Sequence, residues 1–231
     1  MNDWLCQPLT WDPARAYDRG KVMTAEELEA GRDFGRYLDV DGDGIPYRTL
    51  PGTHPSKGSY FTRGTTRDAY ARYSEAGPDY LYNVTRLLNK FATAKELVPQ
   101  PVLRKAARET RFGVIYFGST SPAMSEAFDT LQAEGVHIDL LRVRAFPFSA
   151  AVDRFVAEHE AVFVVEQNRD AQLRMMLINE QEIAPAKLEP ILHYDGTPIT
   201  ARFIIEAIAK RSRSDNVEPI RAKSVRKGAV A

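Results

Sequence analysis

The stretch FGVIYFGSTSPAMSEAFDTLQAEG, Phe112 to Gly135, decides the fold because it joins a short apolar run to an amphipathic helical pattern. The run from Phe112 to Gly118 has the length and the aromatic and β-branched residues of a buried strand. Ser121 then opens a helix with Pro122 in its first turn, and Gly135 closes it. The pattern predicts a β-strand followed directly by an α-helix.

The same alternation continues toward the C-terminus. Further strands are predicted at Ile138 to Arg144, Ala161 to Gln167 and Leu188 to His193, with helices between them and a last helix after Thr200. Because these runs are apolar throughout, both faces of the sheet are expected to be covered by helices. The second half of the chain is therefore predicted to be an α/β domain with a parallel sheet.

The first half of the chain lacks this alternation. Thr24 and Glu27 form a capping box that opens a helix to about Tyr37, and a second helix is expected from about Pro78 to Leu97. Between them lies a loop, Asp39 to Ser74, that is rich in Gly, Pro and Thr and longer than a compact domain usually contains. We predict a loop-rich and helical extension that lies against another surface.

Composition excludes several classes of protein. The chain has 31 basic and 31 acidic residues, so its net charge of zero gives no electrostatic basis for binding nucleic acid. Cys6 is the single cysteine, which excludes an internal disulfide and a cysteine-based iron–sulfur or zinc site within this chain. No run approaches the roughly 20 apolar residues of a membrane span, and the N-terminus does not resemble a signal peptide. We expect a cytoplasmic protein.

The run DVDGDGIPYRTL, which begins at Asp39, resembles the start of an EF-hand calcium loop. Asp39, Asp41 and Asp43 supply oxygen ligands at the first, third and fifth positions, and Gly44 is the turn glycine at the sixth. The twelfth position, which requires a bidentate carboxylate, is Leu50. We therefore predict a structural turn of aspartate and glycine that does not bind calcium tightly.

In an open parallel sheet, ligands bind beyond the carboxyl ends of the strands, where three turns carry polar groups. GSTSP, from Gly118, either binds an anion or simply caps a helix. RVRAFPF, from Arg142, either presents two arginines or is a strand end with packed aromatic residues. EQNRD places Glu166, Asn168 and Arg169 at the end of a buried strand, where they form either a polar turn or a contact with a partner or ligand.

The long loop holds a further candidate in the run TRGTTRDAY, which begins at Thr62. Arg63 and Arg67 lie beside threonine hydroxyls in this run. The planar guanidinium fork suits a carboxylate or a phosphate, and the alternative is a pair of solvated loop arginines. The sequence shows no nucleophile paired with a base, and so no catalytic residue is assigned.

Several of these blocks together resemble a known family, the alpha subunit of 2-oxoacid:ferredoxin oxidoreductases, most closely of the 2-oxoglutarate type. The similar blocks are DVDGDGIPYRTLPGTHPSKGSYFTRGTTRDAYARYSE, RLLNKFATAKELVPQP, GVIYFGSTSPAMSEA, LLRVRAFPF, FVVEQNRDAQLR and LHYDGTPITARFI. The resemblance runs from Met1 to about Arg211 and covers only the C-terminal portion of such a subunit. The gamma-like domain and the main part of the pyrimidine-binding domain would precede it.

The resemblance also implies a division of the chain. Residues 1–101 would be the end of the pyrimidine-binding domain with its connecting segment. Residues 102–211 would be a parallel-sheet α/β domain resembling the transketolase C-terminal domain. Residues 212–231 form a basic tail without apolar periodicity, which is predicted to be disordered.

The reaction that the resemblance implies is the oxidative decarboxylation of 2-oxoglutarate to succinyl-CoA with reduction of ferredoxin. The complex would use thiamine diphosphate, Mg²⁺, an iron–sulfur cluster and coenzyme A, none of them bound by this chain alone. Its partners would be the beta subunit, the missing N-terminal alpha-subunit domains and, through the complex, ferredoxin. Arg63 would reach the substrate carboxylate or coenzyme A. We expect the isolated chain to be inactive; the alternative is a non-catalytic interaction or anion-binding module.

Overall fold

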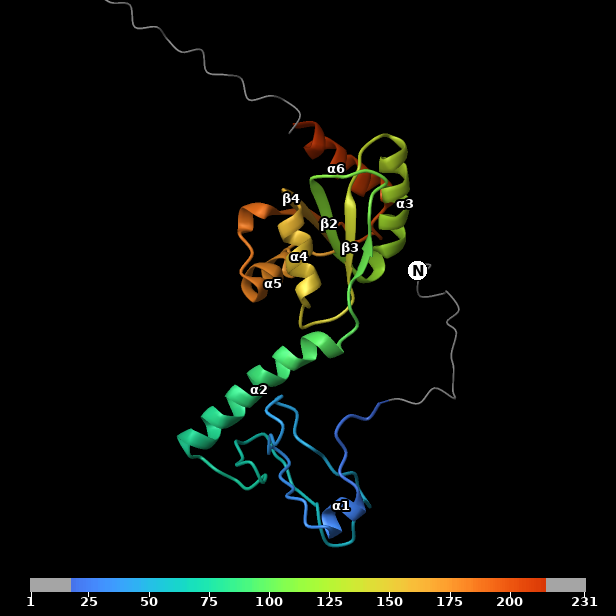
Figure 1. The fold of residues 1–231 in the computed structure, drawn as a ribbon. Helices are drawn as coiled ribbons and strands as arrows, with labels where there is room; N and C mark the ends of the chain where they lie inside the picture. The colour runs from blue at the N-terminus through green and yellow to red at the C-terminus, as the bar shows by residue number, and fades with distance from the viewer. Residues whose placement is uncertain (1–17, 215–231) are drawn as a thin grey trace, which may run out of the picture. The chain divides into compact units, whose positions relative to one another are not determined.

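The computed structural model describes residues 18–214, with the side chains of residues 18–211. Within this range the chain forms two compact units (Figure 1). The first unit contains the described residues up to Gln100 together with Ala145–Ser149, and the second contains Pro101–Arg144 and the described residues from Ala150 onward.

The second unit is built on a five-stranded sheet in the order β1-β3-β2-β4-β5. Four strands run parallel, namely β2 (Phe112–Phe117), β3 (Asp139–Val143), β4 (Ala161–Glu166) and β5 (Leu188–Leu192). The short edge strand β1 (Val102–Arg104) pairs antiparallel with β3. The α/β fold and the parallel sheet predicted from the apolar runs are confirmed. Sequence reasoning missed β1 because its residues are exposed and carry no strand pattern.

Helices cover both faces of this sheet (Figure 1). On one face lie α3 (Ser121–Ala133) and α6 (Ala201–Ser214), and on the other lie α4 (Ala150–Glu158) and α5 (Gln172–Gln181). The short 3-10 turns η2 (Gly118–Thr120) and η3 (Pro185–Lys187) precede α3 and β5. The helix α6 continues past the predicted boundary at residue 211, and residues 215–231 of the predicted tail lie outside the described residues.

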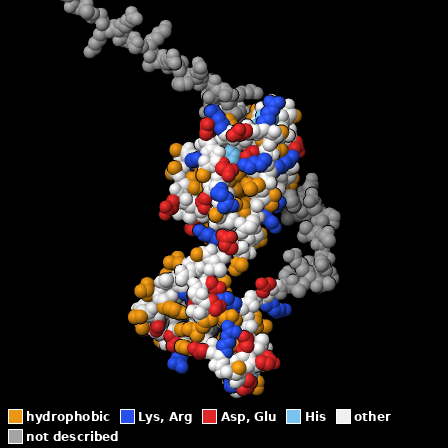
Figure 2. All heavy atoms as spheres, viewed as in Figure 1, with side chains coloured by type: hydrophobic (Ala, Val, Ile, Leu, Met, Phe, Trp, Pro, Cys, Tyr) orange, Lys and Arg blue, Asp and Glu red, His pale blue; other side chains and the backbone are white. Residues whose placement is uncertain are grey.

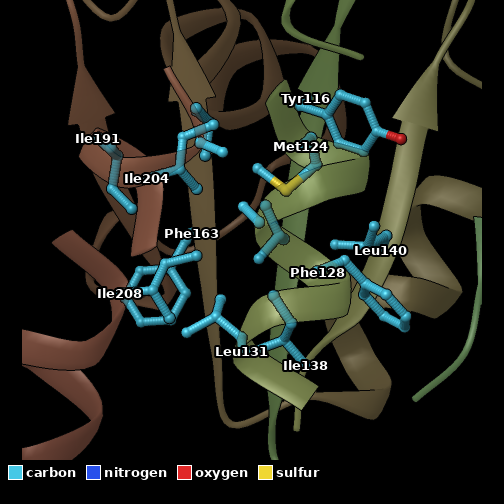
Figure 3. Packing of buried hydrophobic residues seen from close by; sticks show 14 of the residues in the cluster. Tyr116, Met124, Phe128, Leu131, Ile138, Leu140, Phe163, Ile191, Ile204 and Ile208 are labelled. Atoms are coloured by element: carbon cyan, nitrogen blue, oxygen red, sulfur yellow. The ribbon is translucent and has the colours of Figure 1, made fainter. Parts of the chain in front are cut away.

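Apolar side chains of the sheet, α3 and α6 form one core (Figure 3). In the register, Val114 of β2 lies opposite Leu140 of β3 and Phe163 of β4, so the three side chains point to the same face. Burying a side chain of this size contributes about 1.5–3 kcal/mol. The helices complete the layer with Met124, Phe128, Leu131, Ile204 and Ile208.

The first unit has two α-helices among its described residues, α1 (Ala25–Glu29) and α2 (Gly77–Leu97). The capping box before α1 is confirmed, since Thr24 Oγ1 accepts from the Glu27 amide at 3.3 Å and Glu27 Oε2 accepts from the Thr24 amide at 2.8 Å. The helix is far shorter than predicted, because Gly31 adopts a left-handed backbone with φ of 81°. The long α2 is confirmed, and the segment between the two helices is mostly irregular.

Candidate functional site

The aspartate-rich turn of the first unit is closed by a lysine. Lys21 Nζ lies 2.6 Å from Asp41 Oδ2 and 2.6 Å from Asp43 Oδ2, while Asp39 accepts bonds from the amides of Gly42 at 3.1 Å and Gly44 at 2.9 Å. Partial burial lowers the pKa of Lys21, but its hydrogen bonds to the two carboxylates outweigh this and raise the pKa above the ordinary value. The geometry is that of the structural turn predicted from the sequence.

Three arginines of the first unit line one cavity of about 410 Å³. Arg63 and Arg67 come from the long loop, and Arg86 comes from the middle of α2. Arg63 is exposed, whereas Arg67 and Arg86 are buried, with exposed fractions of 8% and 7%. The sequence singled out Arg63 and Arg67. It gave no signal for Arg86, because only the fold brings the centre of α2 against the loop.

The buried carboxylate of Glu166 holds the turn between β4 and α5. Glu166 is fully buried, and its oxygens accept from the amides of Leu173 at 2.7 Å and Arg174 at 3.0 Å and from Asn168 Nδ2 at 2.8 Å. The two backbone amides belong to the first turn of α5, where backbone N–H groups lack partners within the helix. Glu166 is therefore a buried structural residue that holds the turn against the start of α5.

The other two polar residues of this turn lie nearer the surface. Asn168 is partly buried, and its Oδ1 accepts from the Gln172 amide at 3.2 Å. The side chain of Arg169 is 74% exposed and pairs with Asp170 at 2.7 Å. Of the three residues assigned to an interface from the sequence, Arg169 therefore presents the most surface to a partner.

The other two polar turns at the carboxyl ends of the strands make contacts within the chain. Gln167 Nε2 donates to Ser119 Oγ at 3.1 Å and to Thr120 Oγ1 at 3.2 Å, which occupies two hydroxyls of the GSTSP turn. Thr120 makes no side-chain bond that caps α3. In the RVRAFPF turn, the rings of Phe146 and Phe148 pack edge to face, with their centroids 5.4 Å apart.

A buried polar cluster at the amino edge of the sheet was not predicted from the sequence. His159, at the end of α4, contacts the Phe155 carbonyl at 2.6 Å and Asp139 Oδ2 at 3.2 Å, and Lys105 Nζ lies 2.9 Å from the same oxygen. Burial raises the pKa of Asp139, but the hydrogen bonds from Lys105, the Ala106 amide and His159 outweigh it and hold the pKa below the ordinary value.

The surface of the first unit is partly apolar. Helix α2 exposes large apolar side chains, and hydrophobic atoms are visible at the surface of the first unit in Figure 2. Within residues 18–214, no group of three or more His, Cys, Asp or Glu side chains is placed to hold a metal ion. No helix in the same range is long and apolar enough to cross a membrane.

Comparison with known proteins relates the chain to one enzyme family. No family model matches it. Over 205 residues it is 27% identical to subunit alpha of 2-oxoacid:ferredoxin oxidoreductase 2 from Aeropyrum pernix, a match that covers 87% of this chain and 30% of the relative. The chain thus spans about a third of the length of this curated relative.

Among solved structures, 2-oxoglutarate:ferredoxin oxidoreductase from Magnetococcus marinus, with 2-oxoglutarate, coenzyme A and succinyl-CoA bound, matches 78% of this chain and 31% of that chain, with a TM-score of 0.68 and 22% identity. A split-gene transketolase, described as an inactive beta4 tetramer, matches 48% of this chain and 40% of that chain, with a TM-score of 0.41 and 18% identity. The first match shows a shared fold. The chain is a homologue of 2-oxoacid:ferredoxin oxidoreductase alpha subunits.

Proposed function

We propose that the chain is the C-terminal part of the alpha subunit of a 2-oxoglutarate:ferredoxin oxidoreductase. The assembled enzyme would decarboxylate 2-oxoglutarate, transfer the succinyl group to coenzyme A and pass the electrons to ferredoxin. Homology to an alpha subunit over 87% of the chain supports this role, and so does the fold shared with the Magnetococcus marinus enzyme. Preference for 2-oxoglutarate rests on the sequence resemblance to that subtype.

The single observation that carries the subunit role is the exposed apolar face of α2. Tyr80, Val84, Leu87 and Phe91 follow one another at spacings of four, three and four residues, so they share one side of the helix. Leu88 flanks them and is 65% exposed. A continuous apolar face of this kind marks a surface that another protein covers. We define these residues, together with Leu81, as the α2 face.

In the proposed complex, this chain would support the assembly and the other parts would hold the reaction centre. Thiamine chemistry requires a carboxylate that activates the pyrimidine ring, a divalent ion that holds the diphosphate and an electron acceptor. We assign thiamine diphosphate, Mg²⁺ and the iron–sulfur cluster to the beta subunit and the N-terminal alpha-subunit domains. Asn168 and Arg169 would contact the beta subunit, and Arg63 would contact an anionic group of substrate or coenzyme A.

Co-purification tests the subunit role. The full chain is expressed with the N-terminal alpha-subunit domains and the beta subunit, and a tag on this chain should recover both in a fixed ratio. Replacing Asn168 and Arg169 together by alanine should leave the chain folded and reduce recovery of the beta subunit at least tenfold, since arginine anchors commonly contribute about 2 kcal/mol. A chain that recovers neither partner would favour the alternative, a non-catalytic module.

A further inference from the structure

The cavity beneath the long loop of the first unit contains two buried cations without a counter-ion. Neither Arg67 nor Arg86 forms an ion pair with a carboxylate among the described residues. The Nε–H of each is buried and lacks a hydrogen-bond acceptor. A buried guanidinium that is neither paired nor fully hydrogen-bonded is costly, so two in one cavity indicate that a negative group belongs there.

The groups that do touch these arginines carry no formal negative charge. The Gly44 carbonyl accepts from Arg86 Nη1 at 3.1 Å, and the guanidinium lies 5.6 Å from the centre of the Tyr37 ring. Arg67 lies 5.9 Å from the centre of the Tyr73 ring. Burial lowers the pKa of Arg86, as does the charge of Arg36. These contacts orient the guanidinium groups without neutralising them.

The one carboxylate whose charge acts on Arg86 is engaged elsewhere. Asp39 acts on Arg86 through its charge, but its carboxylate accepts from the amides of Gly42 and Gly44 within the aspartate-rich turn. Gly44 also packs tightly, because a Cβ there would lie 2.2 Å from the Lys90 amide nitrogen of α2. The turn is thereby fixed against the helix, and Asp39 is held in its place in the turn.

Other polar groups of the cavity suit a small oxyanion. Thr65 and Thr66 line it and offer hydroxyl donors, and exposed Arg63 adds a third guanidinium at the rim. Asn83 donates to the Arg67 carbonyl at 2.5 Å, while its buried Oδ1 has no donor and is available to accept a hydrogen bond from a hydroxyl group of the ligand. A volume of about 410 Å³ lies within the range of small-molecule sites.

We propose that this cavity is a binding site for the oxyanion of a small molecule, a phosphate or a carboxylate, held by Arg67, Arg86 and Arg63. The buried arginines supply fixed donors with little exposure to water, and the exposed arginine attracts the anion from solvent. The site is formed by the first unit alone. It shares Arg63 with the proposed function and three lining residues with the α2 face, but binding to the isolated chain is measured apart from assembly and catalysis, so the two proposals can fail separately.

Titration of the full chain tests the site. Thermal unfolding and calorimetry are followed with sodium phosphate and with sodium succinate, against sodium chloride at matched ionic strength. At least one of the two oxyanions should raise the midpoint temperature in a saturable way, because it binds the folded chain only. Stabilisation by phosphate alone identifies a phosphate group, and stabilisation by succinate alone identifies a carboxylate.

Variants separate a built site from general charge screening. Arg67→Gln should weaken binding about tenfold or more, and Arg63→Gln should weaken it while leaving the fold intact, since Arg63 is exposed. Arg72→Gln is the matched control, because Arg72 is an exposed arginine of the same loop outside the cavity. The proposal is overturned if neither anion binds, or if Arg63→Gln and Arg72→Gln bind as tightly as the unaltered chain.

Discussion

Glu166, the last residue of β4, accepts a hydrogen bond at 2.7 Å from the backbone amide of Leu173, in the first turn of α5. This contact joins the end of a buried strand to the start of the helix that follows it. Because the carboxylate is fully buried, its charge is balanced by the amides it meets rather than by water. The Glu166 carboxylate therefore stabilises, from inside the chain, the polar turn that is proposed to contact a partner.

We expect Glu166→Gln to destabilise the chain by about 2 kcal/mol, because the amide side chain accepts more weakly and leaves a buried donor facing backbone N–H groups. Chemical denaturation of the purified chain measures this. Glu180→Gln on α5 is the control, since Glu180 is exposed. Equal stability of the two variants would show that the Glu166 carboxylate contributes no more than a surface residue.

The turn at Asp39 to Asp43 should not bind calcium tightly. Lys21 already occupies the space between Asp41 and Asp43, and Leu50 stands where the bidentate ligand of an EF-hand would be. Calorimetric titration with CaCl₂ should show no binding tighter than about 10⁻⁴ M. Micromolar binding would contradict this interpretation.

The cluster at Asp139 predicts a defined acid sensitivity. Its pKa is lower in the folded chain than the ordinary value of 3.8, so its contribution to stability is complete above that value and is lost as the pH falls through the folded pKa. Asp139→Asn should lower stability at neutral pH and flatten the loss of stability below pH 3.8. Denaturation curves measured across this range test both effects, and an unchanged acid limb would refute the assignment.

The α2 face should matter for assembly and not for the fold of this chain. Leu88→Lys should change the stability of the isolated chain by less than about 0.5 kcal/mol, because Leu88 is exposed. The same change should weaken association with the remaining alpha-subunit domains and the beta subunit. Asn89→Lys is the control and should associate normally, because Asn89 is an exposed polar residue of α2 that is not part of the α2 face. Normal association of Leu88→Lys would remove α2 from the interface.

The sequence predicted what local patterns determine and missed what depends on distant contacts. The parallel strands could be predicted because each apolar run carries its own signal, as Phe112–Phe117 does. The extent of α1 was overestimated even though Gly31, which ends the helix, is a local signal in the sequence. Arg86 looks like any helix arginine in sequence, and only the packing of α2 against Gly44 and Arg67 reveals it as part of a cavity.

The candidate interface shows the same limit. A run of polar residues at a strand end predicted that Glu166, Asn168 and Arg169 have partners. The sequence could not distinguish an internal partner from an external one. The fold makes that distinction for Glu166, whose acceptors are filled by residues several positions further along the chain.

Ferredoxin reduction in the presence of 2-oxoglutarate and coenzyme A tests the proposed subunit role directly. It is measured with the purified chain, with the N-terminal alpha-subunit domains plus the beta subunit, and with all parts combined. We expect reduction only when this chain and the other parts are present together. Reduction by the isolated chain, or full reduction by the other parts without it, would show that this chain is not the proposed subunit part.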